Sequence, residues 1–170
     1  MDVIVAVDRN WGIGKNGTQH VVLSADRKFF RNVTSGGAVI VGRKTLADFS
    51  GGRPLAGRIN IVISSDTGLK IDGAVIVHSL AELFLELEKI NTDKVLVIGG
   101  GSVYQTLLPY CRYAYITKID VLEDADTFFP NLDDDINWTL CDTGEEQTEN
   151  GIAYSFVRYE NNMPLIWQGE

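Results

Sequence analysis

Residues 95–104 read Val95-Leu96-Val97-Ile98-Gly99-Gly100-Gly101-Ser102-Val103-Tyr104, an apolar run that ends in three consecutive glycines. The pattern predicts a buried β-strand over residues 94–98 and a helix over residues 102–108. A strand that turns through glycines into a helix directs unpaired backbone N–H groups at one point, where a phosphate fits. Glycine also lets the backbone approach a ligand closely. The turn follows neither the G-x-G-x-x-G pattern nor a Walker loop, so phosphate binding and a tight structural turn are equal alternatives here.

Strand and helix patterns alternate on both sides of this turn. Helices are expected from Ser24, from Gly42 and over residues 80–90, and strands over residues 3–8, 38–41, 60–64, 74–78 and 113–119. Ser24 is a suitable N-cap for the first of these helices. The alternation predicts an α/β fold, with a mostly parallel central sheet of about eight strands and helices on both faces.

The C-terminal part departs from the alternation. Residues 138–159 are expected to supply two antiparallel strands separated by the polar stretch 143–151, so that the sheet ends in an antiparallel C-terminal strand. A chain of 170 residues has the usual size of one domain. We therefore expect a single domain over residues 1–160 and a C-terminal extension over residues 161–170. The extension could pack on the domain or mediate a contact.

The charge balance excludes several classes of partner. The formal net charge is −8, with 23 acidic and 15 basic residues, which argues against nucleic acid and anionic membranes. No apolar run approaches the roughly 18–20 residues that span a bilayer, and no signal peptide is expected. Cys111 and Cys141 form no metal-ligand pattern and are expected to be reduced thiols of a cytoplasmic protein. The acidic runs 123–126 and 133–135 are interpreted as solvated loops, with metal binding as a minor alternative.

Two further segments carry charge where a ligand could use it. Gly42-Arg43-Lys44-Thr45 lies where a strand meets a helix, and its two bases suit a ligand with several phosphates, including a 2′-phosphate. Two solvated cations are the alternative. Arg58 closes a loop between strands and could pair with a ligand carboxylate, with surface solvation as an equal alternative.

Asp26 is the candidate for proton chemistry. It lies in the first turn of the expected helix, among the apolar residues Leu23, Phe29 and Phe30. A carboxyl group that such neighbours desolvate is suited to hold or relay a proton. The alternative is a first-turn acid that interacts with the helix dipole.

Taken in order, these segments resemble the dihydrofolate reductase family over about residues 1–160. The resemblance rests on Asp26 with Phe30, Gly42-Arg43-Lys44-Thr45, Arg53-Pro54-Leu55 through Arg58, and Ile98 to Tyr104, together with residues 6–14, Thr117 with Ile119-Asp120, and Asp126-Thr127 before Phe129-Pro130. It implies NADPH-dependent reduction of 7,8-dihydrofolate to 5,6,7,8-tetrahydrofolate for one-carbon metabolism. A hydride would be transferred to C6 of dihydrofolate, and a proton would be transferred to N5.

The resemblance also implies the site residues. Asp26 would bind the pterin N3 and 2-amino edge, Thr117 would support Asp26, and Arg58 would bind the glutamate carboxylate. The pterin and benzoyl pocket would be lined by Ile4, Val5, Phe30, Phe49, Leu55, Ile98 and Tyr104. NADPH would lie against Ala6, Ile13, Gly14, Gly42, Arg43, Lys44, Thr45, Ser65, Gly99, Gly100, Gly101, Ser102, Val103 and Tyr104, with the Gly99–Gly100 peptide cis. No metal is implied. The implied partners are dihydrofolate and antifolate inhibitors, and the protein is expected to be a monomer.

The segment before Asp26 departs from the family pattern. Val21 stands where the family carries a tryptophan, whose indole N–H is therefore missing. Arg27 replaces an apolar residue and would lower the pKa of Asp26 if it reached the carboxylate, or else project to solvent. Ser102 replaces a base, so that the preference for NADPH rests on Arg43 and Lys44. His20 is interpreted as a loop histidine, with a substitute hydrogen-bond donor or acid as the alternative. The changed segment predicts altered antifolate affinity.

Two other functions remain open at this point. One is a different reductase on the same fold, such as the pyrimidine reductases of riboflavin synthesis, which would not need Arg58 for a glutamate tail. The other is a pterin- or nucleotide-binding module with little turnover, which would not obviously need Asp26 and Thr117.

Overall fold

The computed structural model describes residues 1–19 and 21–168, except for the side chain of Phe49. Its strands are β1 (Asp2–Val7), β2 (Gly12–Gly14), β3 (Ala38–Gly42), β4 (Ile59–Ile63), β5 (Ala74–Val77), β6 (Val95–Gly99), β7 (Tyr113–Ile119), β8 (Thr127–Phe128), β9 (Trp138–Thr143), β10 (Gln147–Glu149) and β11 (Ile152–Asn161). Its helices are α1 (Ser24–Thr34), α2 (Arg43–Ser50), α3 (Leu80–Lys89) and α4 (Gly101–Leu107), which a 3₁₀ turn, η1 (Leu108–Tyr110), extends.

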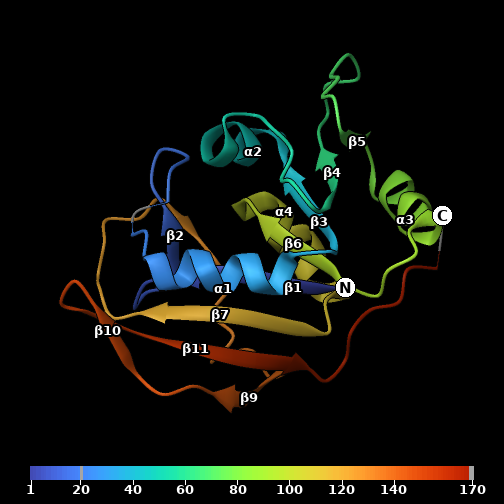
Figure 1. Cartoon of the computed structure of the whole chain (residues 1–170). Coiled ribbons are helices and arrows are strands. Elements are labelled where there is room, and N and C mark those ends of the chain that lie inside the picture. Colours follow the sequence, from blue (N-terminus) through green and yellow to red (C-terminus); the bar gives the residue numbers. More distant parts are fainter. Residues whose placement is uncertain (20, 169–170) are drawn as a thin grey trace.

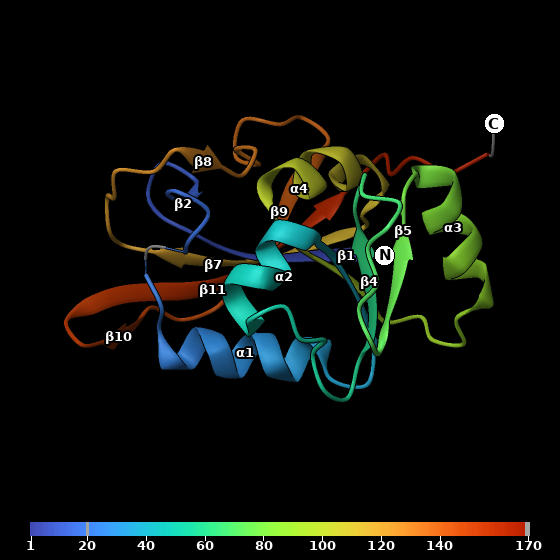
Figure 2. The same ribbon diagram turned by 90° about the horizontal axis from the view of Figure 1, so that it is seen from above.

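The main sheet confirms the predicted architecture. Its strands follow the order β10-β11-β7-β1-β6-β3-β4-β5, and β9 pairs with β11 off this path. Every pairing from β7 to β5 along this order is parallel, whereas β11 is antiparallel to β7, β9 and β10. Figures 1 and 2 show α1 along one face of this sheet and α4 on the other.

The central strands are apolar throughout because both of their faces are covered. In β6, Val95 and Val97 pack in one hydrophobic cluster, whereas Leu96 and Ile98 pack in a second. The first cluster holds residues of α3 and α4, and the second holds residues of α1 and α2. Successive side chains of a strand point to opposite faces, so an unbroken apolar run is what a sheet with two covered faces requires.

Three short strands, β2, β8 and β10, were not predicted. Residues 9–23, for which no strand was expected, contain β2, which pairs antiparallel with β8 in a separate small sheet. The C-terminal region also supplies three strands, β9, β10 and β11, where two were expected. The polar stretch 143–151 includes the additional strand, β10.

The chain beyond β11 packs on the domain. The indole of Trp167 stacks on the ring of Phe84 in α3, with centroids 4.8 Å apart and planes 5° apart. The backbone N–H of Leu165 donates a 2.9 Å hydrogen bond to the carbonyl oxygen of Pro109. Residues 162–168 therefore cross from β11 to α3. No helix within the described part of the chain is long and apolar enough to span a bilayer.

Candidate active site

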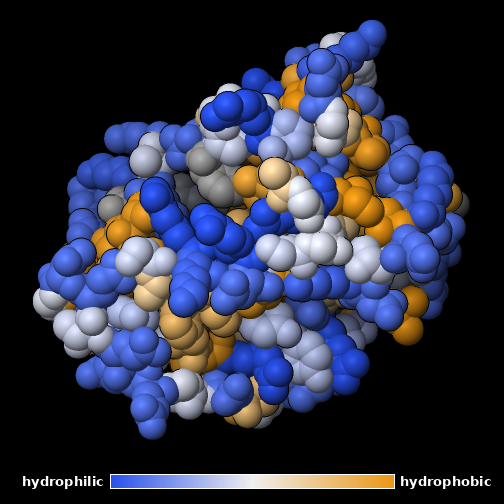
Figure 3. Space-filling view, viewed as in Figure 1, coloured by the Kyte–Doolittle hydropathy of each residue, from blue (hydrophilic) through white to orange (hydrophobic). Residues whose placement is uncertain are grey.

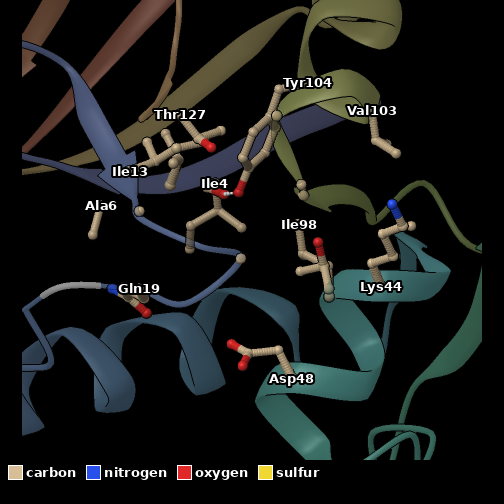
Figure 4. A pocket seen from close by; sticks show the side chains of 18 of the residues that line it. Ile4, Ala6, Ile13, Gln19, Lys44, Asp48, Ile98, Val103, Tyr104 and Thr127 are labelled. Atoms are coloured by element: carbon tan, nitrogen blue, oxygen red, sulfur yellow. Dashed lines mark hydrogen bonds between the residues drawn. The ribbon is translucent and has the colours of Figure 1, made fainter. Parts of the chain in front are cut away.

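A cavity of about 1120 Å³ opens where β1, β3 and β6 end, between α1, α2 and α4. Figure 3 shows hydrophilic side chains across the middle of this face of the molecule. Figure 4 shows the pocket from close by, with Tyr104 and Ile4 at its centre and Lys44 and Gln19 on opposite sides. The hydroxyl of Tyr104 donates a 2.9 Å hydrogen bond to the carbonyl oxygen of Ile4, which joins α4 to β1.

The triple-glycine turn forms one wall of this cavity. The Gly99–Gly100 peptide is cis, as the resemblance implied, and Gly99 has φ of 122°, a conformation that favours glycine. A Cβ atom at Gly100 would lie 2.5 Å from Oγ1 of Thr45, at the start of α2. The turn at the end of β6 and the turn at the end of β3 therefore meet with no room for a side chain between them.

Asp26 lies in the first turn of α1 and lines the cavity. Oγ1 of Thr117, which is fully buried on β7, donates a 2.7 Å hydrogen bond to Oδ1 of Asp26. Burial raises the pKa of the Asp26 carboxyl, and hydrogen bonds from Thr117 and Gln19 lower it in part. Asp26 is thus a half-buried carboxyl group that keeps its proton to a higher pH than a free aspartic acid.

The N-terminus of α1 is capped from a distant strand. The expected N-cap, Ser24, is wrong: the N-cap residue is Leu23, which makes no side-chain capping bond. Instead, the carboxylate of Glu149 on β10 accepts hydrogen bonds from the Ser24 N–H at 2.8 Å, the Ser24 hydroxyl at 2.6 Å and the Ala25 N–H at 3.0 Å. A carboxylate satisfies these free N–H groups and interacts favourably with the helix dipole. Glu149 thereby fixes the helix turn that carries Asp26.

Arg58 is held at the cavity by two neighbouring residues. Its guanidinium donates to Oγ1 of Thr34 at 3.0 and 3.2 Å and to the carbonyl oxygen of Ala56 at 2.7 Å. Burial lowers the pKa of Arg58, and the nearby charge of Arg31 lowers it further. An arginine fixed beside another cation is a favourable position for a carboxylate of a ligand.

The segment after β2 bridges the cavity. The hydroxyl of Thr18 donates a 3.1 Å hydrogen bond to Oδ1 of Asp48 on α2. The Asn16 N–H donates to the carboxylate of Asp126 at 2.8 Å, and Lys15 forms an ion pair with Asp124. Contacts on both sides therefore hold residues 15–19 over the cavity.

The cavity brings together almost every residue expected to bind substrate or cofactor: Ile4, Val5, Ala6, Ile13, Gly14, Asp26, Phe30, Gly42, Arg43, Lys44, Thr45, Leu55, Arg58, Ser65, Ile98, Gly99, Gly100, Gly101, Ser102, Val103 and Tyr104. Thr117 lies behind Asp26 and does not line the cavity. The side chain of Phe49 and residue His20 lie outside the described residues. The lining residues that sequence reasoning missed are Gly17, Thr18, Gln19, Val22, Arg27, Arg31, Asp48, Ile63, Ser64 and Thr127.

The structure shows where Arg27 and Val21, the two residues near Asp26 that depart from the family pattern, are located. Arg27 is exposed and forms no ion pair with Asp26 among the described residues, so it follows the solvent alternative. Val21 is half-buried and packs with Leu23, Ala6 and Ile119 in a small apolar cluster. The acidic runs place no metal-binding cluster within the described part of the chain.

Comparisons with known proteins give one family. Residues 1–161 match the family described as Dihydrofolate reductase. The dihydrofolate reductase of Bacillus subtilis (strain 168) is 36% identical over 159 residues, 92% of each chain. That of Staphylococcus haemolyticus is 34% identical over 161 residues, 94% of this chain and 95% of the relative. A solved structure, dihydrofolate reductase from Enterococcus faecalis complexed with NADP(H) and RAB-propyl, matches with a TM-score of 0.83 at 31% identity over 95% of both chains.

Proposed function

Because this chain belongs to the dihydrofolate reductase family and reduces 7,8-dihydrofolate to tetrahydrofolate with NADPH, we propose that Asp26 and Thr117 carry the proton side of that reaction. The observation that supports this assignment is the 2.7 Å hydrogen bond by which the buried Thr117 holds Asp26 at the wall of the cavity. An ionised carboxylate has about four acceptor positions, so it can accept from a ligand as well as from Thr117. A pterin N3–H and 2-amino group are donors of matching kind.

The raised pKa of Asp26 suits this task. Burial raises the pKa, so the carboxyl group gains a proton at a higher pH than usual. A group whose pKa approaches the working pH exchanges protons most effectively. NADPH supplies the hydride when bound, whereas Asp26 holds the pterin edge and favours the substrate protonated at N5.

The remaining substrate contacts follow from the lining of the cavity. Arg58 is assigned to the glutamate carboxylate, because its guanidinium is already oriented by Thr34 and Ala56. The ring system is assigned to the apolar side chains Ile4, Val5, Phe30, Leu55 and Ile98, with Tyr104 and Phe49.

The cofactor is assigned to the opposite side of the cavity. The backbone of the Gly99–Gly101 turn and Thr45 suit a pyrophosphate, because no side chain separates the two turns. Arg43 and Lys44 are exposed bases at the start of α2 and suit the adenosine phosphates, with Ser65 and Ser102 beside them. Ala6, Ile13 and Gly14 are assigned to the nicotinamide.

The substrate assignment is tested by comparing dihydrofolate with a dihydropterin that lacks the glutamate. Loss of NADPH absorbance is followed for wild type, Arg58→Gln and Arg53→Gln, the last an exposed arginine of the same loop. Arg58→Gln should raise KM for dihydrofolate about 10- to 100-fold, whereas KM for the short substrate stays unchanged. Arg53→Gln should match wild type. An unchanged KM for dihydrofolate in Arg58→Gln contradicts the assignment.

The cofactor assignment has its own test. Arg43→Ala and Lys44→Ala should each weaken the binding of NADPH much more than the binding of NADH, which lacks the 2′-phosphate. Equal losses with both cofactors contradict a role for these bases in the preference.

We also propose that the protein acts as a monomer in the cytoplasm, with the reductase domain over residues 1–160 and an extension over residues 161–170. One chain supplies every wall of the cavity, which supports a monomer. Cys111 and Cys141 are unpaired thiols, which supports a reducing compartment.

A further inference from the structure

The chain contains two Asn-Gly pairs, Asn16-Gly17 and Asn150-Gly151, which form matching turns. Figure 1 shows the first turn after β2 and the second between β10 and β11. The φ angles are 53° and 81° in the first pair and 52° and 77° in the second, as in a type I′ hairpin turn. Both pairs are exposed, and a Cβ atom at either glycine would meet no atom within 4 Å. The two turns therefore match in sequence, local conformation and exposure.

An asparagine that precedes a glycine is reactive in water. The backbone nitrogen of the glycine attacks Cγ of the asparagine, and the side-chain amide takes up the displaced proton and leaves as ammonia. Water then opens the resulting succinimide to aspartate or to isoaspartate, in which the main chain runs through the former side chain. Glycine favours this attack because it has no side chain beside its nitrogen. Water is the one co-reactant that the sequence of steps requires.

The two turns differ in how firmly they are held closed. In a type I′ turn, the ψ angle of the asparagine keeps the glycine nitrogen away from Cγ, so the turn must open before the ring forms. Asn150-Gly151 closes a ladder of three residue pairs between β10 and β11. Asn16-Gly17 instead lies in an isolated bridge, which two 3.0 Å hydrogen bonds between Lys15 and Thr18 form. The turn at Asn16 should therefore open more often.

The attacking residue of the first turn also faces the ligands. Gly17 lines the cavity, next to Thr18, whose hydroxyl bridges to Asp48 on α2. Its N–H group has no hydrogen-bond partner within the described part of the chain. A ligand that fills the cavity would contact Gly17 and hold the turn closed. The reaction, in contrast, requires the open turn.

The product of the reaction would disturb the closed segment. The N–H of Asn16 donates a 2.8 Å hydrogen bond to the carboxylate of Asp126, and Lys15 forms an ion pair with Asp124. Conversion of Asn16 would place a new carboxylate next to these two acids, and like charges repel. Isoaspartate would in addition lengthen the main chain of the turn. Both changes favour release of the segment from Asp126.

We propose that Asn16-Gly17 is a site of spontaneous deamidation whose rate depends on whether the cavity is occupied. In the protein without ligand, the turn opens and Asn16 is converted to aspartate and isoaspartate. Bound NADPH keeps the turn closed and protects Asn16. Because the ligand and the reaction select opposite conformations, the converted protein binds NADPH more weakly.

The site of the reaction is located by peptide mass mapping of the full-length protein, which detects the conversion of amide to acid and separates isoaspartate by its retention. Wild type is incubated in mildly alkaline buffer, alone, with saturating NADPH, and in urea that unfolds it. In the folded protein, Asn16 should react about tenfold faster than Asn150, and in urea the two rates should be similar. NADPH should slow the reaction at Asn16 about fivefold or more and leave Asn150 unchanged.

The effect on binding is measured by calorimetry with NADPH, on fresh protein and on protein incubated until Asn16 is converted. Asn16→Gly and Asn150→Gly are matched variants, because glycine adopts the positive φ angle of either position. Incubated wild type and incubated Asn150→Gly should bind NADPH about fivefold more weakly than the fresh samples. Incubated Asn16→Gly should keep the affinity of fresh Asn16→Gly.

A reaction at Asn16 that is no faster than at Asn150 in the folded protein, or that NADPH does not slow, overturns the inference. An unchanged affinity for NADPH after conversion of Asn16 overturns its connection with the cavity. These readouts do not involve Asp26, so their failure is distinct from a failure of the proposed proton chemistry.

Discussion

Oγ1 of Thr117 donates a 2.7 Å hydrogen bond to Oδ1 of Asp26, although 91 positions separate the two residues in the sequence. Thr117 lies directly opposite Ala6 in the parallel pairing of β7 with β1, and its side chain has no exposed surface. Because the sheet fixes this hydroxyl beneath α1, the carboxyl group of Asp26 is tied to the cavity. The sheet thereby determines where the carboxyl group of Asp26 lies.

Replacing Asp26 should stabilise the protein while it harms the reaction. Burial raises the pKa of Asp26, so the folded protein holds this proton more tightly than the unfolded chain does. The stability from Asp26 is fully present below its unfolded pKa and is lost as the pH rises through its folded pKa. Urea unfolding should therefore show that Asp26→Asn raises the free energy of unfolding at neutral pH by about 1 kcal/mol. In acid, the free energy of unfolding should not be higher than that of wild type. A variant less stable than wild type at neutral pH contradicts this prediction.

Glu149→Gln should weaken α1 in a pH-dependent way. Hydrogen bonds from the Ser24 hydroxyl, then from the Ala25 and Ser24 N–H groups, lower the pKa of Glu149. Its stabilising effect is therefore present above the unfolded pKa and lost as the pH falls through the folded pKa. Thermal unfolding should show a modestly lower Tm for Glu149→Gln at neutral pH and no difference in acid. Glu146→Gln, at an exposed position before β10, is the control, and an equal loss there would refute the capping role.

Gly100→Ala should strain the contact between the two glycine turns. The added Cβ would lie 2.5 Å from Oγ1 of Thr45, and overpacking of this kind costs about 1–3 kcal/mol. Urea unfolding of Gly100→Ala, Thr45→Ala and the double variant measures the coupling. The penalty of Gly100→Ala should fall in the Thr45→Ala background, because the contacting oxygen is then absent. An equal penalty in both backgrounds rules out this contact as the cause.

Trp167→Ala should lower stability without affecting the reaction. The stacking of Trp167 on Phe84 contributes about 1 kcal/mol beyond the area that it buries. Because α3 does not line the cavity, kcat should stay at the wild-type value. Ile166→Ala is a matched control, since 82% of the Ile166 side chain is exposed. A fall in kcat with unchanged unfolding would instead connect the extension to the site.

The sheet could be predicted because its strands are simple in composition. The runs around Val39 and Val97 are apolar throughout, as two covered faces require, and the Gly99–Gly101 turn marks where the sheet meets the cavity. The pair β2 and β8 could not be predicted, because strands of three and two residues are too short to show an alternation of apolar and polar residues.

The missed parts of the site depend on contacts between distant segments. No local pattern connects Glu149 with Ser24, which are 125 residues apart. Gln19 lies in a polar stretch where a glutamine is unremarkable, and only the folded chain shows that it lines the cavity. The sequence also left two directions open for Arg27, and only the orientation of α1 decides for solvent.

The proton role of Asp26 is tested most directly by single-turnover hydride transfer from NADPH to dihydrofolate, measured across pH in wild type and Asp26→Asn. We predict that Asp26→Asn transfers hydride about two to four orders of magnitude more slowly at neutral pH. This deficit should narrow as the pH falls, because solvent then protonates the substrate. Hydride transfer by Asp26→Asn at the wild-type rate, with the wild-type pH dependence, would contradict the role proposed for Asp26.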